Sequence, residues 1–334
     1  MRRLLAVVGA VAMIVGALVI RSGIDDRNEE QAQVYRLVCA SDLGSVCDEL
    51  RDAFPGRVDV TVESAGATAD RLRRLDGDPE LDGWLVADPW PALVDEARRF
   101  GSLGPVFDAS AGPPLARSPL VVVAWKERAE ALAPTCPDAK VGWTCLGEAA
   151  GRPWTERNGR PEWGDVKVGH ADASDDGTGL LVLGQATVSW FDRTDLSTFD
   201  LDEEGFQRWF SGLERPMSPS RTSPLDRMLQ IGRAAYDFVA TTEADAVKVD
   251  TAASRAALTK IYPSPMATAD VVLAVTPGGR GDRLRDVVTE RAAEALTESG
   301  WKAPNAPGLP PGNGQPSPGL LDALRARARE VTGR

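Results

Sequence analysis

The sequence predicts an α/β protein that divides into two lobes. Strand-like and helical runs alternate from residue 34 onward, which is typical of α/β folds with a largely parallel sheet. About 300 residues follow the N-terminal apolar stretch, enough for two lobes because single cores stop growing in this size range. Hydrophobic residues make up 43% and charged residues 26% of the 334-residue chain, as in ordinary globular proteins.

An apolar run at the N-terminus predicts export. Residues 4–20 are apolar, with two arginines before them and two aspartates after them, a pattern that favours a body outside the cytoplasm. As a helix the run would span roughly 25 Å, close to the thickness of a bilayer core. We therefore expect residues 1–24 to be a signal anchor, giving a single-pass cell-membrane protein, or a signal peptide, giving a secreted one. The anchor is favoured because no A-x-A-like cleavage site follows the run.

Four cysteines predict disulfide bonds, because an exported chain meets an oxidising environment. Cys39 and Cys47 are close in sequence, and so are Cys136 and Cys145, which makes neighbour pairing the simplest of the three connectivities. A metal site is the alternative, but the chain has no CxxC motif and its single histidine, His170, is remote from the cysteines in sequence. We expect two bridges and no metal.

The first hundred residues after the apolar run alternate strictly between strands and helices. We expect strands over Val34 to Ala40, Arg57 to Glu63 and Gly83 to Ala87, which are short runs of apolar or β-branched residues that end in small or polar residues. Apolar residues at helical spacing predict helices over 43–54, 69–75 and 92–100. This order indicates a largely parallel sheet.

The rest of the chain continues the alternation around an irregular insert. Residues 135–164 are rich in Pro, Gly, Cys and Trp and are expected to be irregular. The expected strands cover 119–125, 166–170, 235–240, 258–262 and 270–275. The expected helices cover 178–191, 203–213, 224–234, 284–299 and 319–332. A segment dense in Pro, Gly and Asn, residues 301–318, precedes the last helix.

Small and hydroxylated residues recur where strands end and helices begin. Ligands of open α/β sheets bind at such places, because unpaired N–H groups and the helix dipole favour polar acceptors. Helix capping is the alternative role for each of them. The candidate ligand-binding residues are Ser41, Ser64, Gly66, Ser118, Gly177, Thr178, Thr222 and Thr241.

Composition and motifs argue against several functions. A net charge of −11 without a basic cluster argues against a nucleic-acid partner. The chain has no GxSxG, HExxH or Walker motif and no GxGxxG after a strand, so we expect neither an enzyme nor a cofactor. A pair of carboxylates for glycoside hydrolysis stays open, since the 49 acidic residues supply many candidates. His170 is expected to be a structural or solvated residue.

The order of elements resembles bacterial extracellular solute-binding proteins of the type II periplasmic binding protein fold. The resemblance rests on residues 34–41, 63–68, 168–181 and two crossover segments, 115–124 and 261–263. It implies two lobes, formed by residues 33–117 with 263–303 and by residues 118–262, that close on a small polar solute. Residues 308–324 also resemble the end of solute-binding domains that are fused to von Willebrand factor A modules in actinobacteria. The segment 304–334 would then follow the two lobes.

Three functions are compatible with these features. The first is an extracytoplasmic solute-binding protein that captures a small polar ligand for a membrane partner such as a transporter. The second is an envelope interaction or sensing domain that keeps the fold but carries no transported ligand, and the third is a hydrolase. An open polar pocket between the lobes would favour the first, and a filled or closed gap would favour the second.

Overall fold

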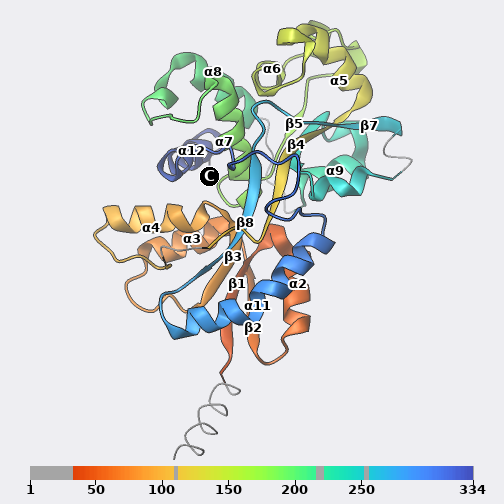
Figure 1. Cartoon of the computed structure of the whole chain (residues 1–334). Coiled ribbons are helices and arrows are strands. Elements are labelled where there is room, and N and C mark those ends of the chain that lie inside the picture. Colours follow the sequence, from red (N-terminus) through yellow and green to blue (C-terminus); the bar gives the residue numbers. More distant parts are fainter. Residues whose placement is uncertain (1–32, 109–111, 216–221, 252–255, 334) are drawn as a thin grey trace, which may run out of the picture.

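The computed structural model describes residues 33–108, 112–215, 222–251 and 256–333. Within these ranges the strands form one eight-stranded sheet in the order β2-β1-β3-β8-β4-β6-β5, with β7 paired to β4. The sheet runs through two lobes, and helices cover it in both (Figure 1). The predicted helix within residues 1–24 lies outside the described part of the chain.

Lobe 1 is the lower half of Figure 1 and contains the N-terminal strands. Strand β1 pairs in parallel with β2 and β3, and β3 pairs antiparallel with β8. Helix α3 packs on α4, and α2 packs on α11. The strands are β1 (Tyr35–Ala40), β2 (Val58–Glu63), β3 (Gly83–Asp88) and β8 (Thr268–Val275). The helices are α2 (Gly44–Ala53), α3 (Ala65–Arg74), α4 (Trp90–Phe100) and α11 (Gly279–Glu298).

One long strand carries the chain from lobe 1 to lobe 2. Strand β4 (Ala116–Trp125) pairs with β8 over its first four residues and with β6 and β7 over the rest. Residues 262–267 bring the chain back from β7 (Leu258–Ile261) to β8. These two crossings lie where the sequence predicts crossover segments. The predicted lobe boundaries within them stay a prediction.

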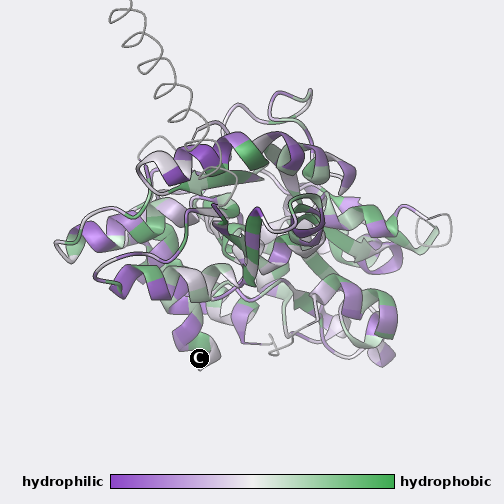
Figure 2. Ribbon diagram, turned by 90° about the horizontal axis from the view of Figure 1, so that it is seen from below, coloured by the Kyte–Doolittle hydropathy of each residue, from purple (hydrophilic) through white to green (hydrophobic). Residues whose placement is uncertain are grey.

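Lobe 2 surrounds the other end of β4. Its remaining strands are β5 (Val168–Gly169) and β6 (Phe238–Thr242). Helix α7 (Gly177–Phe191) is buried on nearly all sides over its first twelve residues, as expected of a helix inside a core. The other helices are α5 (Lys126–Leu132), α6 (Trp143–Ala149), α8 (Glu204–Glu214) and α9 (Pro224–Ile231). Figure 2 shows apolar strands near the middle of the molecule and more polar residues on the outer helices.

The C-terminal residues return to the junction of the lobes. Residues 303–317 contain no helix or strand, and they lead into helix α12 (Pro318–Thr332). This helix contacts α4 of lobe 1 and α7 and α8 of lobe 2, and Figure 1 shows it between the two lobes. The segment is therefore part of the packed structure and spans both lobes.

The expected disulfides are present, and they link neighbours. Cys39 at the end of β1 is bonded to Cys47 in α2, and Cys136 is bonded to Cys145 in α6. The first bridge holds the turn from β1 to α2, and the second holds the segment before α6. A search of the described residues finds no helix long and apolar enough to cross a membrane.

Most elements lie within a few residues of their predicted positions, but two helices were not predicted and the sheet is mixed where a largely parallel one was expected. Strand β8 pairs antiparallel with β3 and β4, and β4 pairs antiparallel with β6 and β7. Helix α5 covers residues 126–132, a stretch too short to show a helical pattern in the sequence. The segment 135–164, predicted to be irregular, contains helix α6. Trp143 and Leu146 of this helix are buried against lobe 2, and the Trp143 indole Nε1 donates a hydrogen bond to Gln185. The helix is short and begins beside glycine and cysteine, so tertiary packing rather than local pattern selects it.

Candidate functional site

A turn of lobe 2, residues 171–178, faces lobe 1 across the junction. Asp176 is the N-cap of α7, and its Oδ1 accepts a hydrogen bond from the Gly179 amide at 2.9 Å. Asp172 shapes the same turn by accepting bonds from the Ser174 amide and hydroxyl. Both are local side-chain bonds of the kind that aspartate forms in turns and at helix starts.

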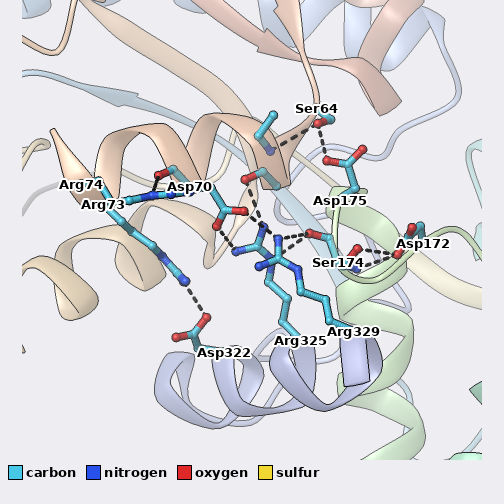
Figure 3. A network of polar contacts seen from close by, with 12 residues as sticks. Ser64, Asp70, Arg73, Arg74, Asp172, Ser174, Asp175, Asp322, Arg325 and Arg329 are labelled. Carbon is cyan, nitrogen blue, oxygen red and sulfur yellow. Dashed lines mark hydrogen bonds and ion pairs between the residues drawn. The ribbon is translucent and has the colours of Figure 1, made fainter. Parts of the chain in front are cut away.

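Ser64 and Gly66 of lobe 1 bond directly to this turn. Ser64 is the N-cap of α3, and its Oγ donates to Asp175 Oδ1 at 2.5 Å (Figure 3). The Gly66 amide donates to the Asp175 carbonyl at 2.8 Å. We call this meeting of Ser64 and Gly66 with Ser174 and Asp175 the lobe contact. The N-terminus of α3, which the sequence predicts as a ligand-binding position, is therefore hydrogen-bonded to lobe 2 of the protein itself.

The lobe contact leaves no room for a side chain at residue 66. A Cβ built on Gly66 would lie 2.4 Å from the Ser174 carbonyl oxygen and 2.6 Å from the Asp175 Cα. Real Cβ atoms essentially never approach other atoms this closely. Gly66 is thus required by close approach of the two lobes.

Two further bonds join the lobes beside this contact. The Trp90 indole Nε1 in lobe 1 donates to the Gly177 carbonyl at 3.3 Å. The Thr178 hydroxyl in lobe 2 donates to Asp42 Oδ2 at 3.2 Å, next to the end of β1. The lobes are therefore closed on each other over the whole start of α7.

A small polar cavity remains between the lobes beyond Thr178. Its volume is about 50 Å³, which is room for a few water molecules or one small solute. We call it the acidic cavity. Its lining residues come from both lobes and from the end of α11: Asp42, Leu43, Ser45, Val46, Thr178, Thr242, Ala244, Asp245, Ser299 and Trp301.

The carboxylates at this cavity are poorly compensated. Burial raises the pKa of Asp42, and the nearby Asp245 carboxylate raises it further. Burial together with the charge of Asp42 raises the pKa of Asp176 well above its usual value, and burial raises that of Asp245. Among the described side chains, no lysine or arginine forms an ion pair with Asp42 or Asp176.

One oxygen at the acidic cavity has no partner. Asp42 Oδ1 is buried and accepts no hydrogen bond from any residue that the structure describes. A buried acceptor left unsatisfied costs about 1–3 kcal/mol, so a bound donor would be favourable there. The described residues contain no group of three or more histidines, cysteines or acids placed to hold a metal ion.

His170 supports the turn from inside lobe 2 and does not face the cavity. Its Nε2 lies 2.7 Å from Glu214 Oε1, its Nδ1 lies 2.7 Å from the Ala171 carbonyl oxygen, and its side chain is 1% exposed. Burial alone would lower the pKa of His170, but Glu214 and the Ala171 carbonyl outweigh burial and raise it. The structure thus shows a buried ion pair and the structural role that the sequence favours.

The structure brings some predicted site residues together and separates others. Thr241 lies next to the cavity residue Thr242, and its hydroxyl donates to Asp245 at 3.0 Å, whereas Ser41 is exposed beside Asp42. Ser118 Oγ accepts a hydrogen bond from the Ala244 amide, so its hydroxyl is used inside the protein. Thr222 is exposed before α9, whose buried residues belong to a separate hydrophobic cluster of lobe 2. The eight candidates therefore do not line one gap, because several are used in capping and packing.

Sequence reasoning missed the charged residues of the junction. Asp42 follows Ser41 at the same strand end, and Asp245 lies three residues after Thr242. The sequence therefore places both aspartates near strand ends, but it does not show that they line the same cavity. Arg325 gave a clearer signal. It follows Leu321 by four residues on the buried face of α12, where an arginine is unusual unless it is paired.

A larger pocket lies within lobe 1, away from the junction. It has a volume of about 390 Å³ and lies between the start of β3 and the start of α11. Two of its basic groups are engaged: Arg280 pairs with both oxygens of Asp82, and Arg98 donates to three backbone carbonyls. Arg36 also lines the pocket and pairs with Asp78, and its Nε has no partner among the described residues.

Comparisons with known proteins show similarity in structure alone. No family model and no curated protein matches the chain. The structure of the periplasmic binding protein AfuA from Actinobacillus pleuropneumoniae, with fructose-6-phosphate bound, is similar with a TM-score of 0.58 and 12% identity. That match covers 89% of this chain and 97% of AfuA.

Two further solved structures are similar at the same level. A periplasmic thiamin binding protein has a TM-score of 0.55 and 13% identity over 90% of this chain and 96% of its own. The apo ferric ion-binding protein A of Pasteurella haemolytica has a TM-score of 0.53 and 12% identity over the same shares. At such low sequence identities these matches show a shared fold and nothing more. The chain has the two-lobed fold of periplasmic solute-binding proteins.

Proposed function

We propose that this chain is an extracytoplasmic, non-enzymatic binding domain that holds a small cationic solute, of the size of ammonium, in the acidic cavity. The observation that carries the proposal is the buried, unpartnered Asp42 Oδ1 in a polar cavity. A cation with N–H donors would satisfy this oxygen and offset the charge of Asp42 and Asp245, the two carboxylates that line the cavity.

The size of the cavity limits the ligand class. About 50 Å³ holds a few waters but no sugar ring or nucleotide. The carboxylates disfavour anions such as phosphate, because like charges repel strongly where solvent is scarce. A hydrolase would need room for its substrate beside its carboxylates, and the closed lobes leave none.

The proposed location outside the cytoplasm has separate support. Two disulfides link buried cysteines, and such bonds persist in oxidising compartments. The resemblance of residues 308–324 to domains fused to von Willebrand factor A modules is consistent with an envelope partner. Delivery of the solute to a membrane transporter is part of the proposal, as is the N-terminal membrane anchor.

The test is cation-dependent thermal stability. The protein is melted in a buffer whose only cation is bulky, and ammonium, methylammonium, sodium or potassium is then added. Binding to the folded state alone stabilises it by RT ln(1 + [L]/Kd), about 2.7 kcal/mol at a hundred times Kd. We expect ammonium or methylammonium to raise the Tm of the wild-type protein.

Asp42→Asn is the decisive variant, and Asp48→Asn is its matched control. Asp48 lies on α2, is exposed and pairs with Arg51, so the control removes the same charge away from the cavity. The cation effect should vanish in Asp42→Asn and persist in Asp48→Asn. An equal effect in both variants, or no effect of any cation on the wild-type protein, would contradict the proposal.

A second function is favoured by the closure of the lobes. The direct bonds of Ser64 and Gly66 to Asp175 match the filled gap expected of an envelope interaction or sensing domain. In that case the protein binds a partner through its outer surface, and no solute enters. Capture of a transporter subunit from solubilised membranes by the tagged full chain supports delivery of a solute. Capture of other envelope proteins, together with a failed cation test, supports the second function.

A further inference from the structure

The C-terminal residues 304–333, which we call the clasp, contact both lobes and the strands between them. The Arg117 side chain on β4, which is 8% exposed, pairs with Asp270 on β8. The same guanidinium donates to the carbonyls of Pro310 and Gly312 of the clasp. The clasp is thereby anchored on the two strands that join the lobes.

Beyond this anchor the clasp lies on α7. The Gln315 amide donates to the Leu181 carbonyl at 3.2 Å. A Cβ on Gly184 would lie 2.2 Å from Gln315 Oε1 and 2.8 Å from Leu321 Cδ2, so α7 presents a glycine where the clasp passes. Helix α12 then buries Leu320, Leu321, Leu324 and Ala328. This packing removes apolar surface from water and fixes the helix between the lobes.

Arg325 reaches from α12 into the lobe contact. Its Nη2 donates to the Gly66 carbonyl of lobe 1 at 3.0 Å, and its Nε donates to the Ser174 carbonyl of lobe 2 at 2.8 Å (Figure 3). Its Nη1 pairs with Asp70 Oδ1 at 2.8 Å. The guanidinium also lies over the Trp90 ring, 5.0 Å from the ring centroid.

These groups form a binding site for a guanidinium, which we call the guanidinium box. A carboxylate and two carbonyls accept a hydrogen bond from each of its three nitrogens, the carboxylate offsets its charge, and an aromatic ring faces its π system. The box is shared between the lobes, because Asp70, Gly66 and Trp90 belong to lobe 1 and Ser174 to lobe 2. Arg325 is 1% exposed within it. Closing the lobes completes the box, and filling the box favours closure.

We propose that the clasp is a tethered occupant of the lobe junction, and that Arg325 in the guanidinium box closes the lobes without any solute. In this respect the chain carries its own ligand, which goes beyond the binding of a cation in the acidic cavity. The box accepts guanidinium compounds once Arg325 is truncated, and their binding restores closure. Arg329 assists from the rim by pairing with Asp70 at 2.7 Å.

The test compares Arg325→Ala with Arg327→Ala in the full chain. Arg327 lies on the same helix, and its hydrogen bonds within the described part of the chain go to Leu201 and Asp202 of lobe 2, so its loss leaves the box intact. The radius of gyration is measured by small-angle X-ray scattering, and the Tm is measured in parallel. A closed chain of about 300 residues should be near 19 Å. We expect a larger radius and a lower Tm for Arg325→Ala, and wild-type values of the radius for Arg327→Ala.

Chemical rescue separates the box from ordinary loss of packing. Millimolar methylguanidinium should return the radius of Arg325→Ala to the wild-type value and raise its Tm. Sodium at equal ionic strength should do neither, and the wild-type protein should respond to neither salt. A merely structural arginine predicts a lower Tm with an unchanged radius and no rescue, and this result would overturn the proposal.

A second variant keeps the test informative if Arg325→Ala does not fold. Arg325→Lys retains the charge and the helix propensity, but one ammonium cannot reach Gly66, Ser174 and Asp70 together. We expect a radius between those of the closed and open forms. A wild-type radius and Tm for Arg325→Lys would contradict the proposal as firmly as a failed rescue. Neither outcome depends on the cation test at Asp42, which concerns the other side of the junction.

Discussion

The two sides of the lobe junction differ in how their charges are compensated. At the lobe contact, Asp70 pairs with Arg325 and Arg329, and the two arginines hold the pKa of this carboxyl below its usual value although burial raises it. At the acidic cavity, Asp42 and Asp176 have raised pKa values and no ion pair among the described residues. The arginines of the clasp thus compensate the charge on one side, whereas no ion pair of the described residues compensates Asp42 or Asp176 on the other.

This difference indicates how a solute-binding fold can be closed and still retain a binding site. Closure of such folds normally depends on the free energy of contacts that the ligand makes with both lobes. Here Arg325 makes contacts of that kind from within the chain. The lobes therefore close without a solute. The cavity that remains between them is small because the two lobes are in direct contact.

The largest expected effect comes from breaking the compensated side at Asp70. Asp70→Asn leaves the buried Arg325 without its carboxylate. Loss of one partner of a fully buried ion pair lowers the free energy of unfolding by about 3–5 kcal/mol. Because Asp70 is partly exposed, we expect a loss of about 2–4 kcal/mol here. Urea unfolding followed by circular dichroism measures the loss. The matched control is Asp322→Asn on α12, whose partner Arg73 lies nearer the surface, and it should cost less than about 1 kcal/mol. Equal losses for the two variants would refute a special role for the box.

An effect of comparable size is expected at His170, which supports the turn that both sides share. His170→Gln leaves Glu214 buried without its positive partner and should destabilise the protein by about 3 kcal/mol at pH 6. The folded-state pKa of His170 is raised, so its contribution is full below about pH 6.5 and is lost as pH rises through the folded value. The difference between wild type and variant should therefore shrink by pH 9. A difference that stays constant from pH 6 to pH 9 would show that folding does not raise the pKa of His170.

The smallest expected effect has the opposite sign. Asp88 at the end of β3 lies near the clasp, and burial together with the charge of Asp270 raises its pKa to about 6. The folded state disfavours the ionised form of Asp88. The resulting loss of stability is absent below about pH 4, where Asp88 is protonated, and is complete above about pH 6, where it is ionised. Asp88→Asn should raise stability by about 1–2 kcal/mol at pH 7.5 and leave it unchanged at pH 4. A loss of stability at pH 7.5 would mean that the Asp88 carboxylate is compensated after all.

The sequence was sufficient to predict most elements but few of the site's contacts. Strands and helices over residues 34–100 follow from local sequence pattern, since short apolar runs form the strands and apolar residues at helical spacing form the helices between them. Helix α6 was not predicted, because Trp143 and Leu146 form their stabilising contacts only with distant elements. Of the eight candidate residues, Ser64, Gly66, Gly177 and Thr178 meet the opposite lobe, and all four form hydrogen bonds to protein there.

By itself the amino-acid sequence determined the α/β alternation, and it favoured neighbour pairing of the cysteines. Both depend on residues that are close in the chain, where spacing specifies which side chains share a face or a turn. The two crossings were expected from the resemblance of the element order to solute-binding proteins. Only the tertiary structure decided that Arg325 meets Gly66 and Ser174, from which it is separated by 259 and 151 residues, and that Asp42 meets Thr178. Such pairings depend on how whole lobes dock, and docking is the sum of many contacts that no local pattern records.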